Sequence, residues 1–279
     1  DRLYQNVEER AAFLEAINPY WSAAESRNFF GTYIQYVIEG ANALSSGDYT
    51  KDIEIYDRLT AHTNKMGDVF AQGLYDYITS GPQNTGNLPP QEGQQCITYD
   101  QMNAIYNIRM FWFELATWTI NYMFSRYTGI GDPQEVFARL KKVPADYPNI
   151  LTQVFGEQIA ADSLQTINTY FDLIDALITA RMEGNIDEMN RITQLLYQNA
   201  DKQAALVSSA NPFWDQEEWR SRLYNNIRST IEESTSVLSG DYARTIDIFS
   251  RILDQSESTG NYFAQGLFNY INYSQQKQQ

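Results

Sequence analysis

The chain has 279 residues, the length of about two domains, and its 20 Lys and Arg against 35 Asp and Glu give a net charge of −15. This surplus of carboxylates argues against nucleic acid and anionic lipid as partners, because both require clustered cations. A single Cys and a single His exclude an intrachain disulfide framework, a thiolate zinc site and any site with two imidazoles. No apolar stretch approaches about 18 uncharged residues, which predicts that no segment spans a membrane.

The first predicted helix covers about residues 3–16, and an internal repeat follows it. Residues 17–79 align without gaps on 210–272. An Asn-Pro-aromatic-Trp motif begins at Asn18 and again at Asn211, and the motif Phe-Ala-Gln-Gly-Leu begins at Phe70 and again at Phe263. Self-similarity of this kind indicates a duplicated structural unit.

Each copy is predicted to hold two long helices. Ser22 with Glu25, and Asp215 with Glu218, have the spacing of a capping box at the start of the first helix. A Ser-Gly-Asp-Tyr turn, 46–49 and 239–242, then separates the two helices, with its glycine in the left-handed C′ position and its aspartate capping the next helix.

Between the copies, the sequence predicts a linker and further helices. Proline and glycine in 83–98 mark the linker. Apolar residues at helical spacing and helix-breaking glycines predict helices near 101–127, 133–144, 157–183, 186–208, 215–238 and 241–272. We therefore expect an all-α protein of up-down helical bundles built from a duplicated unit, the first copy incomplete. The domains are 1–82, a half-unit that repeats about 194–275; the linker 83–98; 99–275, a complete bundle; and a tail, 276–279.

The half-unit 1–82 lacks counterparts of the helices near 101–127 and 157–183. A few helices cannot easily bury their apolar faces alone. Either this half packs on the complete bundle, or helices from a longer parent chain or another subunit complete it.

The segment Ile-Arg-Met-Phe-Trp-Phe-Glu-Leu-Ala-Thr-Trp-Thr, residues 108–119, resembles the first-helix signature of an uncharacterised bacterial family. That family occurs mainly in Bacillus- and Clostridium-type organisms, is often duplicated, and is sometimes labelled acetylglutamate kinase. The resemblance implies a helical bundle. It does not imply a kinase, because this sequence lacks the strands and glycine-rich phosphate loops that such an enzyme needs.

The resemblance also implies that three histidines of the family are replaced in this chain. The corresponding positions hold Leu115, Tyr170 and Asn226, and Tyr33 is the counterpart of Asn226 in the first copy. A site built on those imidazoles in relatives would be lost in this protein.

Four residues are candidates for a ligand site inside the bundle: Glu114, Tyr170, Asn226 and Glu232. Glu114 and Glu232 are expected to face inward, but neither has a histidine three residues later, as carboxylate metal sites in bundles commonly have. We therefore expect no metal ligand, no catalytic residue and no cofactor.

The first functional hypothesis is a non-catalytic helical bundle that acts in assembly, through self-association or a protein partner, with a cell or spore surface as one setting. The alternative is a bundle that binds a metal or a small ligand between its helices. The third is an enzyme, which would need titratable groups converging in a pocket. The low lysine content and the many Asn, Gln and Tyr favour the cell surface slightly over the cytoplasm.

Overall fold

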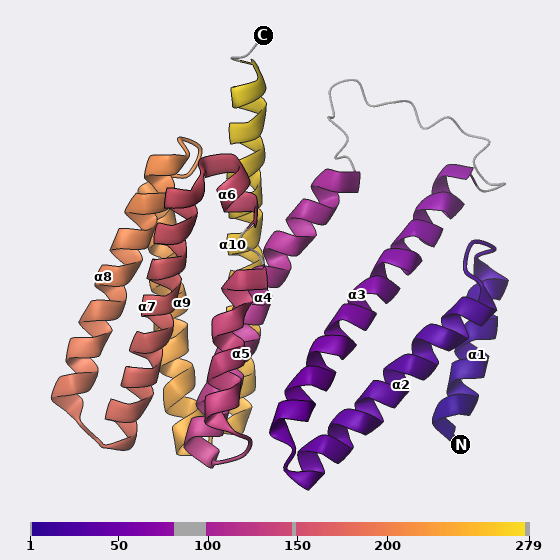
Figure 1. Cartoon of the computed structure of the whole chain (residues 1–279), viewed down its shortest axis with the longest axis horizontal. Coiled ribbons are helices and arrows are strands. Elements are labelled where there is room, and N and C mark those ends of the chain that lie inside the picture. Colours follow the sequence, from indigo (N-terminus) through magenta and orange to yellow (C-terminus); the bar gives the residue numbers. More distant parts are fainter. Residues whose placement is uncertain (1, 81–98, 147–148, 277–279) are drawn as a thin grey trace. The chain divides into compact units, whose positions relative to one another are not determined.

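A computed structural model describes residues 2–80, 99–146 and 149–276, which form helices and contain no strand (Figure 1). In chain order the helices are α1 (Arg2–Ile17), α2 (Ala23–Ser46), α3 (Tyr49–Ser80), α4 (Tyr99–Thr128), α5 (Pro133–Asp146), α6 (Asn149–Phe155), α7 (Glu157–Met182), α8 (Ile186–Ala210), α9 (Gln216–Ser239) and α10 (Tyr242–Gln276). The prediction of an all-α helical bundle is confirmed.

The predicted helices match the observed ones within a few residues, and two differences stand out. The seven-residue α6 was not expected, and α10 continues to Gln276, the first residue of the predicted tail. The predicted linker, 83–98, lies outside the described residues. Within the ranges that are described, no helix is both long and apolar enough to cross a membrane.

The chain divides into two compact units, Asp1–Cys96 and Ile97–Gln279. In the first unit α1 packs on α2, and α2 packs on α3. In the second unit α7, α8, α9, α10 and α4 contact one another in that order, and α4 also contacts α7 and α9. Five long helices therefore enclose the interior of the second unit, with α5 against α4 and α7, and α6 against α7.

The predicted helix ends are present at both copies of the repeat. Ser22 Oγ accepts a hydrogen bond from the amide of Glu25 at 3.4 Å, and Asp215 Oδ1 accepts one from Glu218 at 2.8 Å. The turn glycine that ends α2 has φ 75°, and the one that ends α9 has φ 74°. Side chains with a Cβ rarely adopt this conformation, so glycine fixes the turn in each copy.

The two repeated motifs of the second unit contact each other. Asn211 Nδ2 donates a hydrogen bond to the carbonyl of Gly266 at 3.0 Å, and Trp214 Nε1 donates one to the carbonyl of Phe263 at 3.2 Å. The indole of Trp214 lies so close to Gly266 that a Cβ at that position would overlap it. The loop before α9 is thus fixed to α10 by two side-chain hydrogen bonds and a close contact.

The same contacts occur in the first unit. Asn18 Nδ2 donates to the carbonyl of Gly73 at 2.9 Å, and Trp21 Nε1 donates to that of Phe70 at 3.1 Å. Gly73 again lies where a Cβ would overlap the indole of Trp21. The repeated motifs are therefore explained by one interhelical contact that both units make.

Candidate functional site

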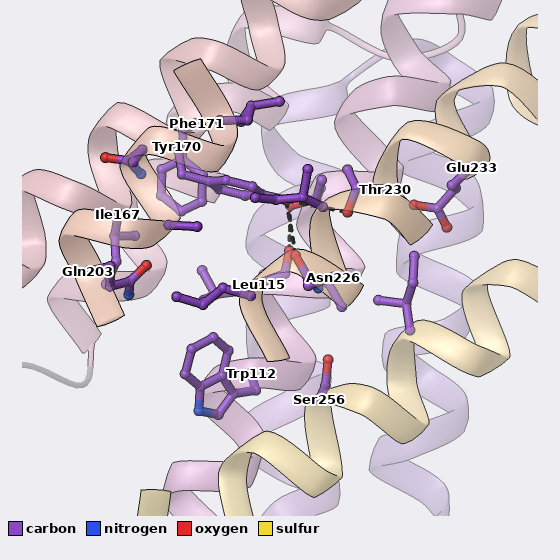
Figure 2. A pocket seen from close by; sticks show the side chains of 18 residues that line it. Trp112, Leu115, Ile167, Tyr170, Phe171, Gln203, Asn226, Thr230, Glu233 and Ser256 are labelled. Carbon is purple, nitrogen blue, oxygen red and sulfur yellow. Dashed lines mark hydrogen bonds between the residues drawn. The ribbon is translucent and has the colours of Figure 1, made fainter. Parts of the chain in front are cut away.

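A small polar cavity lies inside the second unit, between α4, α7, α8, α9 and α10 (Figure 2). Its volume is about 60 Å³, more than the ~10–15 Å³ that one water molecule needs. Its lining combines apolar side chains with a group of polar ones: Thr119, Tyr170, Asn199, Gln203, Asn226, Thr230, Glu233 and Ser256. We call this the polar cavity.

Helix α9 contributes three of these polar residues because of their spacing. Asn226, Thr230 and Glu233 follow one another at intervals of four and three residues, so they share one face of the helix. Asp215 caps the start of α9. The face that carries the three side chains is therefore directed at the cavity along two turns of the helix.

Tyr170 of α7 joins this face of α9 by hydrogen bonds. Its hydroxyl donates to Asn226 Oδ1 at 3.3 Å and lies 3.4 Å from Thr230 Oγ1 (Figure 2). Burial raises the pKa of Tyr170 to about 12, so the hydroxyl keeps its proton at neutral pH. The cavity thus contains a neutral phenol whose contacts are with side chains of the opposite helix.

Glu233 is the only carboxyl group that lines the polar cavity among the described residues. The residue is 1% exposed, and its Oε1 has no hydrogen-bond partner among the residues that the structure describes. Burial raises the pKa of its carboxyl group to about 8, because removing the charged form from water is unfavourable. At neutral pH the group is therefore mostly an uncharged acid.

The structure brings together the three positions at which the resemblance implies lost histidines. Leu115, Tyr170 and Asn226 come from α4, α7 and α9, and all three line the polar cavity (Figure 2). Two of the four candidate residues, Tyr170 and Asn226, are hydrogen-bonded to each other there. Their role in binding a ligand stays a prediction.

Glu114 does not line the polar cavity, although we expected it to face the interior as a ligand. Its Oε2 lies 3.4 Å from Arg139 Nη2 of α5, and the guanidinium group of Arg139 lies over the ring of Trp118, 5.0 Å from its centroid. Glu114 thus compensates a mostly buried cation between α4 and α5.

Glu232 also lies away from the cavity, contrary to its expected inward orientation. It forms ion pairs with Arg244 and Arg251 of α10, and the hydrogen bond from Arg244 is the main cause that lowers the pKa of its carboxyl group. Its neighbour Glu233 occupies the inward face instead.

A residue seven positions after Asn226 returns to within about 20° of it around the helix, whereas one six positions after does not. This register identifies Glu233, which the sequence analysis missed.

A larger and mostly apolar cavity adjoins the polar one. Its volume is about 780 Å³, and fifteen of its twenty lining residues are apolar. Trp112, Ile167 and Gln203 line both cavities, so these side chains form part of the wall between the two. We call it the apolar cavity; α4, α6 and α7 supply most of its wall.

Two polar groups at the wall of the apolar cavity have no hydrogen-bond partner among the described residues. These are the indole N–H of Trp219, in a residue 1% exposed, and the hydroxyl of Ser163, in a residue 3% exposed. Buried polar groups are normally hydrogen-bonded, because leaving one unpaired costs about 1–3 kcal/mol. Both atoms have almost no accessible surface, so they are unsatisfied groups within the packed wall of the cavity.

The charged side chains at the two cavities are acidic. Among the described residues that line them, none is Lys, Arg or His, and Glu157 and Glu233 are the carboxylates. The described part of the chain also has no group of three or more His, Cys, Asp or Glu placed to hold a metal ion. The site therefore presents hydrogen-bonding groups and apolar surface.

Comparison with protein-family models, with curated proteins and with solved structures finds no match to this chain. The family resemblance drawn from residues 108–119 stays a prediction, and the function is inferred from the geometry of the two cavities.

Proposed function

We propose that the second unit, Ile97–Gln279, binds a small and mostly apolar ligand, without carrying out a reaction on it. The observation that carries the proposal is the apolar cavity of about 780 Å³, which adjoins a polar cavity inside the same bundle. Sites for small molecules are typically 300–1,000 Å³, mostly apolar, with a few polar groups that fix the orientation of the ligand.

The chemistry of the wall supports a ligand of this class. An apolar molecule in the cavity gains about 25 cal/mol for each Å² of its surface that leaves water. Polar residues such as Asn107 and Gln203 are scattered in this apolar lining, as is usual in sites for small molecules. The apolar cavity is open to solvent, so an apolar ligand that enters it releases water from this apolar lining, which favours binding.

Filling the apolar cavity is expected to abolish binding. Ala160 is half-buried at its wall, and an Ala160→Phe side chain would occupy space that a ligand needs. We expect the neutral fluorescent probe N-phenyl-1-naphthylamine to bind the full-length chain and to bind Ala160→Phe at least tenfold more weakly. A fluorescence titration measures both affinities.

The control for this titration is Ala243→Phe, which adds the same ring at an exposed position of α10 that lines neither cavity. It should bind the probe as the unchanged chain does. Circular dichroism checks that both variants keep the helical fold. Absence of probe binding to the unchanged chain, or equal binding by Ala160→Phe, would contradict the proposal.

A second candidate function is self-association through the first unit, and differences between matched repeat positions favour it. Leu267 of α10 is fully buried, whereas its counterpart Leu74 in α3 is 49% exposed. A Cβ on Gly260 would lie 3.1 Å from Arg109 Cα of α4, whereas one on its counterpart Gly67 would meet nothing within 4 Å. The face of α10 that α4 covers is thus exposed on α3.

We propose that a second copy of the chain covers this face of α3, because identical faces can pair about a two-fold axis. Light scattering on the full chain should then give the mass of a dimer, and Leu74→Glu should shift it to the 32.2 kDa monomer. Ile186→Glu, at an exposed position of α8, should leave the dimer intact. A monomeric unchanged chain would rule out this candidate.

A further inference from the structure

We propose that the ligand is a primary alkylamine, with its ammonium group in the polar cavity against Glu233 and its alkyl chain in the apolar cavity. The inference rests on the proposed function, since it names the chemistry of the molecule that this site binds. In Figure 2, Gln203 and Ile167, which also line the apolar cavity, lie on one side of the polar cavity, and Glu233 lies on the other.

The polar cavity has space and acceptors for an ammonium group. Such a group is about the size of a water molecule and donates three hydrogen bonds. Glu233, Asn226 and Thr230 line this cavity and carry oxygen acceptors, and Glu233 Oε1 has no hydrogen-bond partner within the described residues. A buried carboxylate paired with a cation that is also hydrogen-bonded meets the conditions under which a buried ion pair is stable.

The charges around the cavities disfavour an acidic head group. A carboxylate or phosphate bound there would lie near Glu233, with no Lys, Arg or His among the described lining residues to compensate it. Glu233 would keep its proton beside such an anion, and the buried charge of the ligand would pay its desolvation cost with no cation to compensate it. A neutral alcohol avoids this cost, but it gains no charge pairing. The site therefore selects amine over alcohol, and alcohol over acid.

Binding of the amine is linked to a proton. Of the residues that line the polar cavity, the titratable ones are Tyr170 from α7 and Glu233 from α9; α4, α8 and α10 contribute no charged side chain to that lining. When an alkylammonium ion binds, the Glu233 carboxyl group loses its proton to solvent and the resulting carboxylate pairs with the cation. Since the carboxyl group has a pKa of about 8, the affinity for the amine should rise roughly 50-fold between pH 6 and pH 8.

The experiment compares decylamine, decan-1-ol and decanoate as competitors of N-phenyl-1-naphthylamine on the full-length chain. At pH 8 we expect decylamine to bind at least tenfold more tightly than decan-1-ol, and decanoate to bind most weakly. Glu233→Gln should bind decylamine no more tightly than decan-1-ol, because the ammonium group would be buried without a counter-charge, and its affinity for decylamine should not change between pH 6 and pH 8. Glu232→Gln is the matched control, and it should behave as the unchanged chain.

The outcomes separate this inference from the proposed function. If the probe binds but the three competitors are equal, or if Glu233→Gln keeps the preference for the amine, the head-group assignment is wrong and the apolar site stands. If decan-1-ol binds more tightly than decylamine, the ligand is a neutral amphiphile and the assignment again fails. If neither the probe nor any competitor binds, the proposed function itself is wrong.

Discussion

The free energy of unfolding of the unchanged chain is expected to fall by about 4 kcal/mol between pH 5 and pH 9, and Glu233→Gln is expected to show no such fall. Burial raises the pKa of the Glu233 carboxyl group from its ordinary value of 4.5 to about 8 in the folded protein. Between these two values the folded state holds a proton that the unfolded state has released, so stability falls as the pH rises. Each pH unit in this window changes the free energy of unfolding by about 1.36 kcal/mol.

Glutamine resembles the protonated acid in shape and carries no proton that titrates in this range. Urea denaturation at pH 5, 7 and 9 should therefore show that the free energy of unfolding of the unchanged chain decreases as the pH rises. For Glu233→Gln this decrease should be absent. Glu232→Gln is the control, because the pKa of Glu232 is lowered by its ion pairs. The stability that these ion pairs contribute is lost only below about pH 4.5, outside the range that is measured. Parallel pH profiles for the unchanged chain and Glu233→Gln would contradict the burial of this carboxyl group.

Trp214→Ala is expected to destabilise the second unit by about 3–5 kcal/mol, the usual cost of truncating a large buried aromatic side chain. Trp214 is 2% exposed, donates to the carbonyl of Phe263, and packs edge-to-face on Trp219 with ring centroids 6.0 Å apart. Alanine removes the hydrogen bond and leaves a cavity beside α10. The free energy of unfolding in urea, followed by circular dichroism, measures the effect.

The matched variant is Trp21→Ala in the first unit. Trp21 makes the equivalent hydrogen bond to Phe70 and packs edge-to-face on its ring at 5.7 Å, but it is only partly buried. Less apolar surface returns to water on truncation, so we expect a smaller cost of about 1–3 kcal/mol. Equal costs at the two positions would show that the indoles are equally buried in solution.

The helices could be predicted from the sequence because their signals are local. Apolar spacing, capping residues such as Ser22 and Asp215, and the turn glycines each act within a few residues. Helix α6 escaped prediction because seven residues make about two turns, too short for a periodic pattern to appear. The contact between the two repeated motifs was also missed, since Asn211 and Gly266 are far apart in the sequence.

The candidate site could be predicted only in part. Tyr170 and Asn226 were named, and the helical register of α9 could have added Glu233 in place of Glu232. Glu114 and Glu232 form ion pairs with arginines of neighbouring helices. The spacing of residues within one helix does not show which arginines lie opposite it, so these ion pairs could not be predicted. The two cavities could not be predicted at all, because their volumes are what remains after the side chains of several helices have packed.

The most direct test of the proposed ligand site is the position of a bound probe. Isotope-filtered NMR on the full-length chain with labelled Ile and Leu methyl groups should show nuclear Overhauser effects between N-phenyl-1-naphthylamine and the methyl groups of Leu164 and Ile167, which line the apolar cavity. It should show none to Leu74 of the first unit. Contacts to Leu74 without contacts to Leu164 and Ile167 would place the probe on the exposed face of α3 and contradict the proposed site.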